Sequence, residues 1–575
     1  MKRNLTAMTE REFDLLVIGA GAFGAAAAWD ASLRGLRVAL IDQCDFGSGA
    51  SAECFKVVHG GIRYLQHGNI RRLRSSCRER SAWLRIAPHL VKPLPIVVPT
   101  FGAGRRGKAF LGAGMYAYDL LTAGRNHAID DPSRRIPGTR FLSRGELLDV
   151  FPELEQPSLT GGAIFNDGQI YNPARLVLAL VRSAVDRGTV AANYVQATDF
   201  LYQGRRVSGV KARDVLNGSD FDIRARLVLN AAGPWAEYLL GDPAHFGQHY
   251  RGHFSRDAFF IVKRRPRSAY ALAVPGQSRD RDTLISRAAR HLFAVPWREH
   301  TLIGVWHRPF AERPDAAAVD DYEIASWITE MNASHPALQL RQEEVSYACC
   351  GLVPFGDGSS NVKELSFGKE SRLVDHQRTH NIAGLVTLIG IRFTMARADA
   401  AMALDLLLQQ WSGKKLRPVA TEHTPLLGGD IADFPALLAQ TLHSRPALIS
   451  AQSLAALVYT HGTEVSALLA RAQLPGESTP IGNSDTLLAE VTHAVETEMA
   501  VRLEDVVLRR TDLGSASHPG REAIEQAASG MQPLLHWSER QRSEEIAATE
   551  QVLRRHHAIV PESRISDRMV EESVR

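Results

Sequence analysis

The feature that most constrains this chain is a strand, a glycine loop and a helix close to its start. Phe13–Ile18 is a short apolar run with β-branched side chains, typical of a buried parallel strand. A loop with the spacing G-x-G-x-x-G follows, and the alanine-rich residues 22–34 favour a helix that stops at Gly35. Residues 37–41 are again strand-like and lead into Asp42. This order is that of a βαβ unit, and it predicts a Rossmann-like α/β fold.

Each glycine of the loop has its own physical role. Gly19 permits the tight turn after the strand, and Gly21 lets the backbone approach a pyrophosphate at the helix N-terminus. Gly24 allows the helix to pack closely on the strand. Asp42 follows the second strand, 18 residues beyond Gly24, where it can bind a ribose hydroxyl. The pattern predicts a bound dinucleotide without separating FAD from NAD; a glycine-rich turn with no ligand is the alternative.

Length and composition set the outer limits. The chain has 575 residues, so roughly two to four domains are expected. Hydrophobic residues make up 45% and charged residues 23%, which is ordinary for a globular protein. The net charge of +4 is too small to favour nucleic acid as a partner. The five cysteines are irregularly spaced with no C-x-x-C pair, so neither a disulfide framework nor a metal site is expected.

Charge and hydropathy bear on location. Residues 1–11 lack the apolar region of a secretory signal, and no uncharged apolar run reaches the ~18 residues that a spanning helix needs. Ten lysines and arginines face one acid between residues 70 and 110, giving that stretch +9 and the remainder about −5. We therefore expect a cytoplasmic protein. The predicted basic helix 70–86 has Ile70, Leu73, Cys77 and Leu84 on one face and arginines over the rest. This helix and the apolar stretch 101–121 could rest on anionic lipid at the inner face of the cell membrane. An ordinary solvated face with a packed hairpin is the alternative.

A longer segment after the βαβ unit resembles a known family. Residues 56–65 read KVVHGGIRYL and are similar to the K-L-x-H-G-G-L-R-Y-L segment of the FAD-dependent glycerol-3-phosphate dehydrogenases. Residues 87–89 (APH), 230–235 (NAAGPW) and 494–514, which contain RRTDLG, resemble further segments of that family. The resemblance runs from about residue 13 to 514 and implies FAD as the cofactor. A soluble NAD-type dehydrogenase is disfavoured by the H-G-G segment.

The resemblance implies an α/β fold of three parts: a Rossmann-like FAD-binding domain, an antiparallel β-rich substrate domain and a C-terminal helical domain. Strand-like runs at 258–262, 291–295 and 301–305 agree with the second part. We expect the FAD-binding domain in residues 13–95, 155–250 and 345–415, the substrate or cap domain in 96–154 and 251–344, the helical domain in 420–545, and a charged tail in 546–575.

The family pattern also implies which residues contact FAD. Gly60 and Gly61 remove side chains where a planar ring must approach the backbone. The turn at 230–235 is read as part of the same crevice, with a purely structural turn as the alternative. The implied contacts are Gly19, Gly21, Gly24, Asp42, Gly49, Ser51, Lys56, His59, Gly60, Gly61, Gly233, Gly390 and Thr394.

The substrate pocket is less well preserved. An arginine of the H-G-G-L-R segment is kept as Arg63, but the arginine of a V-R-P-L segment is replaced by Val353. Arg392 stands where the family has lysine, and His307, with Arg308 next, where it has aspartate. Losing a phosphate-binding arginine should weaken the binding of a phosphomonoester, since charge-assisted hydrogen bonds contribute ~1.5–3 kcal/mol each.

The remaining cations still predict a small anionic substrate, since Lys56, Arg63, Arg308 and Arg392 could all face the pocket. The best interpretation is oxidation of sn-glycerol 3-phosphate to dihydroxyacetone phosphate, with electrons passed to a quinone. Another anionic hydroxy compound, a secondary amine, or a flavin-binding protein without catalysis are the alternatives. Without lipid contact, oxygen or a soluble acceptor would replace quinone.

Oxidation of an alcohol needs a base and an anion clamp. His59 is the first candidate base and His307 the second, because histidine has a suitable pKa. His59 could instead only hydrogen-bond flavin or backbone, and His307 could be a partly exposed strand residue. Arg63 and Arg392 are the candidate clamps, with solvated surface arginines as the alternative.

Overall fold

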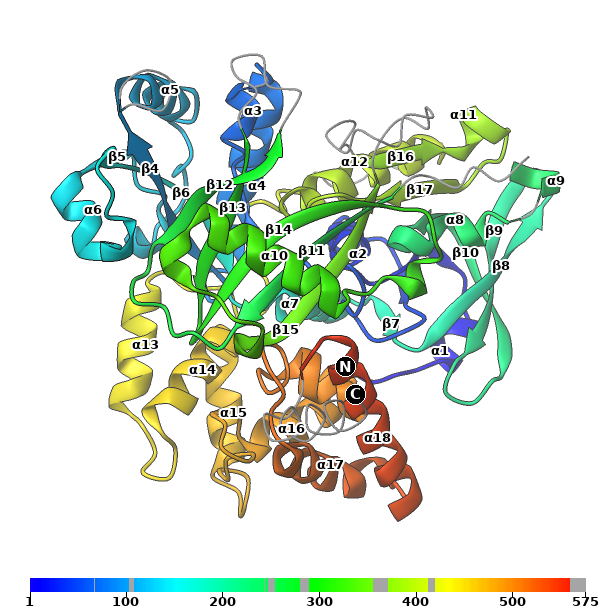
Figure 1. Ribbon diagram of the computed structural model, residues 1–575. Coiled ribbons are helices and arrows are strands. Elements are labelled where there is room, and N and C mark those ends of the chain that lie inside the picture. Colours follow the sequence, from blue (N-terminus) through cyan, green and yellow to red (C-terminus); the bar gives the residue numbers. More distant parts are fainter. Residues whose placement is uncertain are drawn as a thin grey trace, which may run out of the picture.

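The computed structural model describes residues 1–66, 68–102, 108–241, 243–246, 254–279, 289–354, 371–411 and 419–558. Figure 1 shows two sheets side by side, with a group of helices, coloured yellow to red, beneath them. The first sheet contains the predicted βαβ unit, and the second contains the antiparallel runs. The predicted fold class, a Rossmann-like α/β region with a β-rich region and C-terminal helices, is confirmed.

The first sheet is parallel through its centre. Its strands, in order across the sheet, are β16 (Arg372–Asp375), β17 (Leu385–Ile389), β10 (Asp220–Asn230), β1 (Phe13–Ile18), β2 (Val38–Ile41) and β7 (Val190–Ala192). Among these six strands, only β16, at the edge, runs antiparallel to its neighbour, β17. The long β10 also pairs with β9 (Arg206–Asp214), which pairs with β8 (Val195–Gln203). Every residue of β1 is buried, as its apolar sequence predicts.

Helices pack closely against this sheet. The helix α2 (Ala22–Leu33) lies between α7 (Pro173–Asp186) and α12 (Ala396–Gln409), and all three join one core with β1 and β17. Alanines at 25–28 are fully buried, and their small side chains allow this close packing. The helix α7 begins where its sequence predicts, because the Asn172 side chain accepts hydrogen bonds from its first turn.

The second sheet is mainly antiparallel, and only β12 and β4 pair in parallel. In order, its strands are β15 (Val345–Pro354), β11 (Phe254–Val262), β14 (His300–Phe310), β13 (Ala289–Trp297), β12 (Ala271–Arg279), β4 (Val91–Phe101), β6 (Leu159–Ile170) and β3 (Val57–Val58), with β5 (Arg140–Ser143) beside β6. The helix α10 (Asp321–Ser334) packs on one face. The other face turns towards the C-terminal helices.

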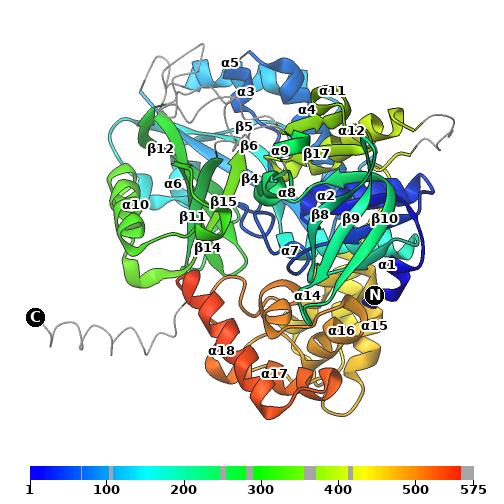
Figure 2. The same ribbon diagram turned by 90° about the vertical axis from the view of Figure 1, so that its right-hand side faces the viewer.

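The C-terminal helices share a core with that sheet. They are α13 (Phe434–His443), α14 (Ala451–His461), α15 (Val465–Ala472), α16 (Leu488–Glu498), the π-helical segment η10 (Asp505–Arg510), α17 (Arg521–Leu535) and α18 (Glu539–Arg555). Figure 2 shows α18 rising towards β11, β14 and β15. The charged stretch expected as a tail from 546 is therefore helical up to Arg555. Its charges face outward while Leu553 is buried, and residues 559–575 lie outside the described part.

The basic helix 70–86 has the predicted bounds as α4 (Ile70–Ile86) but not the predicted faces. Arg80 is fully buried and pairs with Asp167 at 2.7 Å, whereas Ile70 is 43% exposed. The apolar stretch that follows is the helix α5 (Lys108–Leu121) rather than a hairpin. The remaining short helices are α1 (Thr6–Thr9), α3 (Arg63–Gln66), α6 (Arg144–Val150), α8 (Ala236–Leu239), α9 (Pro243–Phe246) and α11 (His376–His380).

Candidate functional site: a dinucleotide cavity between the two sheets

A cavity of about 1420 Å³ is lined by loops at the carboxyl ends of β1, β2, β10 and β17, by one face of the second sheet, and by η10 and α18. Loops at the carboxyl ends of parallel strands are where α/β folds bind nucleotides. Many predicted site residues lie on its wall: Gly19, Gly21, Asp42, Gly49, Ser51, Lys56, His59, Gly61, Gly233, His307, Val353, Gly390, Arg392 and Thr394.

The glycine loop has the geometry that its sequence predicts. Gly19 has a φ of +93°, and a Cβ atom there would lie 2.6 Å from the carbonyl oxygen of Ala231. The helix α2 begins directly afterwards, and its first N–H, on Ala22, donates to Oγ of Ser51 at 2.9 Å. Gly24 lies behind the cavity wall, where a Cβ would overlap the carbonyl of Gly19. Its role is therefore helix–strand packing.

Asp42 closes the nucleotide end of the cavity. Its carboxylate follows β2 and accepts the N–H groups of Ala20 at 2.7 Å and Cys44 at 2.9 Å. Burial raises the pKa of Asp42 to about 6, although both backbone bonds oppose the shift. These bonds fix a hydrogen-bond acceptor on the wall, as recognition of a ribose hydroxyl requires.

The H-G-G segment follows β3, and its His59 and Gly61 line the cavity. The backbone N–H of His59 donates to Oγ1 of Thr394 at 3.1 Å, which ties this segment to the loop after β17. Gly61 lies on the wall with a φ of +74°. Gly60 instead faces α4, since a Cβ there would lie 2.6 Å from Nη1 of Arg80. The structure thus places Gly60 behind the wall, and its expected approach to a planar ring is replaced by packing.

The cations expected in the pocket separate into groups. Lys56 is buried, with Nζ 5.0 Å from the ring centroids of both Phe259 and Trp297. Arg392 lies on the wall and donates to Oγ of Ser76 at 2.9 Å. Arg308 points to the outer face of the sheet.

Arg308 pairs there with Oε1 of Glu323 at 2.9 Å, so the prediction that it faces the pocket is wrong. Alternation along β14 turns it away from the cavity that its neighbour lines. Arg63 begins α3, but its side chain lies outside the described part of the chain.

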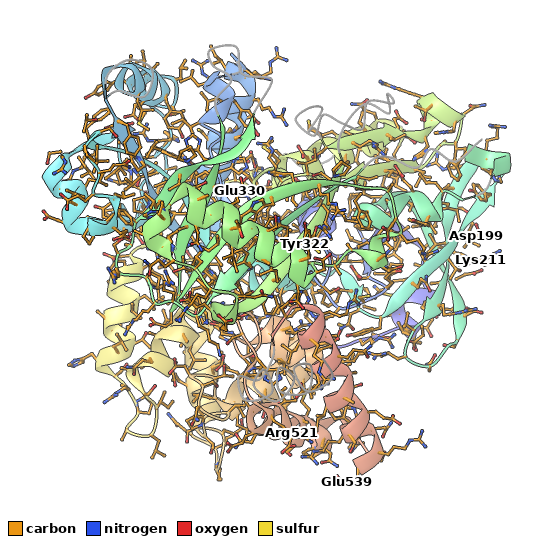
Figure 3. All side chains as sticks on the ribbon, viewed as in Figure 1. Asp199, Lys211, Tyr322, Glu330, Arg521 and Glu539 are labelled. Carbon is orange, nitrogen blue, oxygen red and sulfur yellow. The ribbon has the colours of Figure 1, made fainter. Side chains whose placement is uncertain are left out.

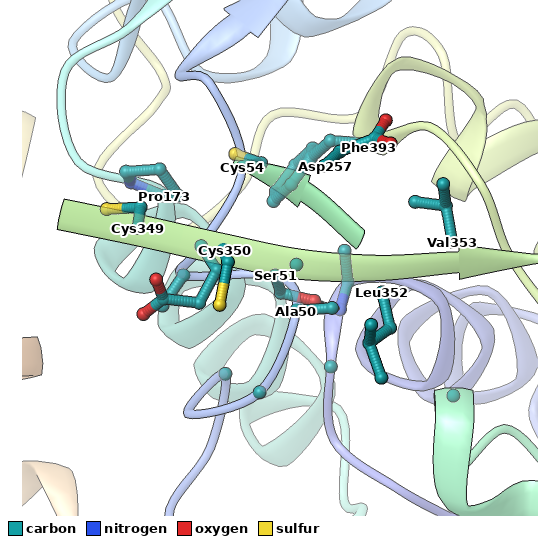
Figure 4. A pocket seen from close by; sticks show the side chains of 18 of the residues that line it. Ala50, Ser51, Cys54, Pro173, Asp257, Cys349, Cys350, Leu352, Val353 and Phe393 are labelled. Atoms are coloured by element: carbon teal, nitrogen blue, oxygen red, sulfur yellow. Dashed lines mark hydrogen bonds between the residues drawn. The ribbon is translucent and has the colours of Figure 1, made fainter. Parts of the chain in front are cut away.

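The wall formed by β11, β14 and β15 carries a residue that the sequence reasoning missed. Oδ1 of Asp257 lies 2.7 Å from Nδ1 of His307, and Ser255 donates to the same oxygen at 2.6 Å. Val353 lies opposite Ser255 in the pairing of β11 with β15. Figure 4 shows Val353 and Leu352 on opposite sides of β15. The register of two antiparallel strands could have revealed Asp257, but a sequence gives no direct measure of register.

A buried group of His461, His493 and Glu498 lies in the C-terminal helices, with ligand-type atoms within 4.8 Å of one another. Glu498 is already held by Arg175 at 2.6 Å and Arg182 at 3.2 Å. These guanidinium groups would repel a cation, so we interpret the group as an ion-pair network. In the described part of the chain, no helix is long and apolar enough to cross a membrane.

The residues fit FAD on geometric grounds. The glycine loop, the Asp42 carboxylate, His59 and the cationic Lys56 and Arg392 line one cavity, whose volume suits a dinucleotide and a further small anion. Fold and site together define a dinucleotide-binding flavoprotein of the oxidoreductase class. Residues 14–396 match the family described as FAD dependent oxidoreductase, and residues 419–542 match the C-terminal domain of alpha-glycerophosphate oxidase.

Similar proteins identify the family within the FAD-dependent oxidoreductases more closely. A protein from Synechocystis named glycerol-3-phosphate dehydrogenase is 28% identical over 95% of this chain and 97% of its own length. One of the same name from Mycobacterium leprae is 30% identical over 93% and 87%. A Bacillus halodurans glycerol-3-phosphate dehydrogenase complexed with FAD has the same fold, with a TM-score of 0.73, 24% identity and 96% of both chains covered. The chain belongs to the FAD-dependent glycerol-3-phosphate dehydrogenase family, and the predictions of family and cofactor are confirmed.

Proposed function

We propose that this enzyme oxidises the secondary hydroxyl of sn-glycerol 3-phosphate to give dihydroxyacetone phosphate. The observation that carries the proposal is the near full-length similarity to proteins named glycerol-3-phosphate dehydrogenase. The cavity supports it, because it joins a nucleotide end to cationic groups. In this proposal the first sheet holds FAD, and the second sheet, with residues 96–154 and 251–344, holds the substrate.

When bound, FAD accepts a hydride from the carbinol carbon. The chain's own groups then bind and orient the alcohol. Arg392 provides a planar guanidinium suited to a phosphate, Arg63 adds a second cation in the family pattern, and the buried Lys56 adds positive potential. His59 and His307 are the candidate bases, and both lie on the cavity wall.

Val353 favours a second candidate, a different small anionic hydroxy compound. The position carries no charge, so the pocket lacks one of the family's phosphate contacts. A carboxylate substrate would lose less from this change, since it carries fewer oxygens and less charge than a phosphomonoester.

We also propose a quinone acceptor and a peripheral contact with anionic membrane. The helix α5 exposes Tyr116 (63%) and Leu120 (80%), and its Tyr118 packs on Leu73 and Cys77 of α4. Ile70, at the start of α4, is also exposed. Figures 1 and 2 place α3 and α5 together at one end of the molecule. Fewer positive charges can face the membrane than the sequence predicts, because Arg80 is buried and Arg85 binds backbone carbonyls. Sedimentation with anionic and neutral vesicles tests this contact.

Anaerobic reduction of the bound flavin tests the activity. We expect sn-glycerol 3-phosphate to bleach the flavin absorbance of the wild-type holoenzyme. A panel of anionic alcohols run in parallel separates the two candidates. Bleaching by another panel member, with none by sn-glycerol 3-phosphate, would overturn the first candidate in favour of the second.

A further inference from the structure

Two residues on the sheet wall, Asp257 and His307, form a hydrogen-bonded pair. Asp257 on β11 and His307 on β14 lie directly opposite each other in the antiparallel register. Side chains paired in this way point to the same face, and both line the cavity. Their contact, Oδ1 to Nδ1 at 2.7 Å, is short enough for a charge-assisted hydrogen bond.

The partners of Asp257 fix the tautomer of His307. The same oxygen, Oδ1, accepts the Ser255 hydroxyl at 2.6 Å, so the carboxylate is the acceptor for both neighbours. His307 therefore donates from Nδ1, and its basic atom is Nε2. A carboxylate in this position also holds the ring in one orientation and stabilises the imidazolium that forms when Nε2 takes a proton.

The neighbours of the pair on this face are uncharged, which suits the binding of a substrate hydroxyl. On the same face, β15 places Gly351 opposite Asp257 and Val353 opposite Ser255. Phe259 follows on β11 and packs in the apolar cluster of this face. The pair is thus the polar part of an otherwise small and apolar strip of the wall. Other charged or titratable side chains that line the cavity include Glu53, Lys56, His59, His291, Arg313, Asp315 and Arg392.

We infer that His307 is the base that removes the hydroxyl proton of the substrate, with Asp257 as its positioning residue. The inference rests on the proposed function for the identity of the alcohol. The O–H bond breaks and its proton goes to Nε2 of His307, while the C–H electron pair leaves the same carbon as hydride for the cofactor, so that a C=O bond forms. Asp257 stays ionised throughout, and Arg392 and Lys56 stabilise the anionic end of the substrate.

Single-turnover reduction of the holoenzyme flavin, measured anaerobically across pH, tests this assignment. His307→Gln should reduce the rate by about 10²–10⁴-fold, the usual contribution of general base catalysis. Asp257→Asn should reduce it by about 10²-fold and also move the midpoint of the acidic limb to lower pH, because the imidazolium loses its anionic partner. Flavin absorbance of the purified variants checks that FAD is retained.

Two further histidine variants serve as comparisons for His307→Gln. His300→Gln changes a histidine on the same strand that does not line the cavity, so it should leave the rate and the pH profile unchanged. In His59→Gln the acidic limb should persist. If the acidic limb disappears in His59→Gln and remains in His307→Gln, His59 is the base and the inference is overturned. An unshifted limb in Asp257→Asn also overturns it.

A readout without turnover separates this inference from the proposed function. In holoenzyme labelled with ¹⁵N-histidine, the resonances absent from His307→Gln should report a ring protonated at Nδ1, and Asp257→Asn should shift them. If sn-glycerol 3-phosphate fails to reduce the flavin, the proposed substrate is wrong, and the pair is judged by these resonances and by reduction with an alcohol that does bleach. Resonances of the opposite tautomer, or unmoved by Asp257→Asn, would overturn the pair.

Discussion

Val353 is the residue at which the pocket departs most clearly from its family's pattern. It lies on the cavity wall, partly buried, on the same face as Asp257. We expect Val353→Arg to lower the KM for sn-glycerol 3-phosphate by about tenfold, since a charge-assisted hydrogen bond contributes ~1.5–3 kcal/mol and 1.4 kcal/mol corresponds to tenfold. Steady-state kinetics with an artificial electron acceptor measures this.

Val353→Met provides the matched control, because it adds length without charge. It should leave the KM near the wild-type value. An arginine variant that behaves like the methionine variant would mean that the anionic end of the substrate does not reach β15, and would favour the second candidate substrate.

Glu490 gives a prediction about pH. Burial raises the pKa of this carboxyl to about 8, against the backbone N–H of Leu487 that it accepts at 2.9 Å. Its folded pKa thus lies above its ordinary 4.5, so its contribution to stability is fully present below about 4.5 and is lost as pH rises towards 8. Glu490→Gln should raise the melting temperature relative to wild type by an amount that grows over this range and levels above it.

Differential scanning fluorimetry at several pH values measures that difference. Glu146 also accepts a backbone N–H at a helix start, in the capping box of α6, but it is exposed. Glu146→Gln should therefore show no such gain in melting temperature with pH. A difference between Glu490→Gln and wild type that does not change with pH would contradict the assigned pKa.

Single residues differ in how far the sequence could predict them. Gly19, Asp42 and Ser51 were predictable because they belong to one βαβ unit and the loop after it, whose spacing is a known motif although its hydrogen bonds span 22 and 29 residues. Asp257 and the buried Arg80 were not, because each depends on a partner about 50 or more residues away. Pairing at that distance is decided by sheet register and by burial of the whole domain, which local patterns do not contain.

At the scale of elements, the loop after β17 is held against the first turn of α2. A Cβ on Gly390 would overlap the Phe23 ring, so a larger residue there requires the ring or the loop to move. We expect Gly390→Ala to push the loop away from α2 and to yield protein with a markedly lower flavin content. The ratio of absorbance at the flavin and protein bands measures this.

A second substitution, at Phe23, should relieve the overlap that Gly390→Ala introduces. Phe23→Ala removes the overlapping ring, so the double variant should recover much of the flavin that Gly390→Ala loses. Gly114→Ala is the control, since a Cβ there meets no atom within 4 Å. No recovery in the double variant would mean that Gly390 is needed by the cofactor itself rather than by Phe23.

Elements with a strong local pattern were predicted well, and elements defined by tertiary contacts were not. The strand β1 and the helix α4 have the bounds that periodicity gives. The faces of α4 were misjudged because Arg80 is drawn inward by Asp167, Tyr118 and the carbonyl of Asn166. The helix α18 was expected to be part of a tail because its mean composition is charged, whereas the burial of a single stripe, including Leu553, keeps it in place.

At the scale of the whole molecule, an ion-pair cluster joins the C-terminal helices to the nucleotide loop, which is the loop that follows β2. Arg510 binds both oxygens of Asp45, at 2.6 and 2.7 Å, and Nε of Arg509 reaches the same carboxylate at 2.7 Å. Asp45 lies in the loop after β2, three positions beyond Asp42, and Arg509 lines the cavity. The C-terminal helices therefore form part of the cavity wall as well as covering the second sheet.

We expect Asp45→Asn to lower both the melting temperature and the retention of FAD. The buried Arg510 would lose its carboxylate partner, whereas Arg509 would keep Glu504 and Asp505. Removing one partner of a buried pair costs about 3–5 kcal/mol. The exposed pair Asp199–Lys211, at 3.3 Å on β8 and β9 (Figure 3), gives the matched control: Asp199→Asn should change stability by only ~0–1 kcal/mol. Thermal denaturation and flavin release, followed together, measure both effects.

The same cluster predicts how the protein fails in acid. Burial alone would raise the pKa of Asp45, but Arg510 and Arg509 outweigh it and lower the value to about 2 from the ordinary 3.8. Its contribution is therefore present above about 4 and is lost as pH falls through about 2. Wild type should lose stability over this interval by more than Asp45→Asn does, because the variant has no carboxylate to protonate. Equal acid sensitivity of the two proteins would show that the C-terminal helices are held to the nucleotide loop by contacts other than this carboxylate.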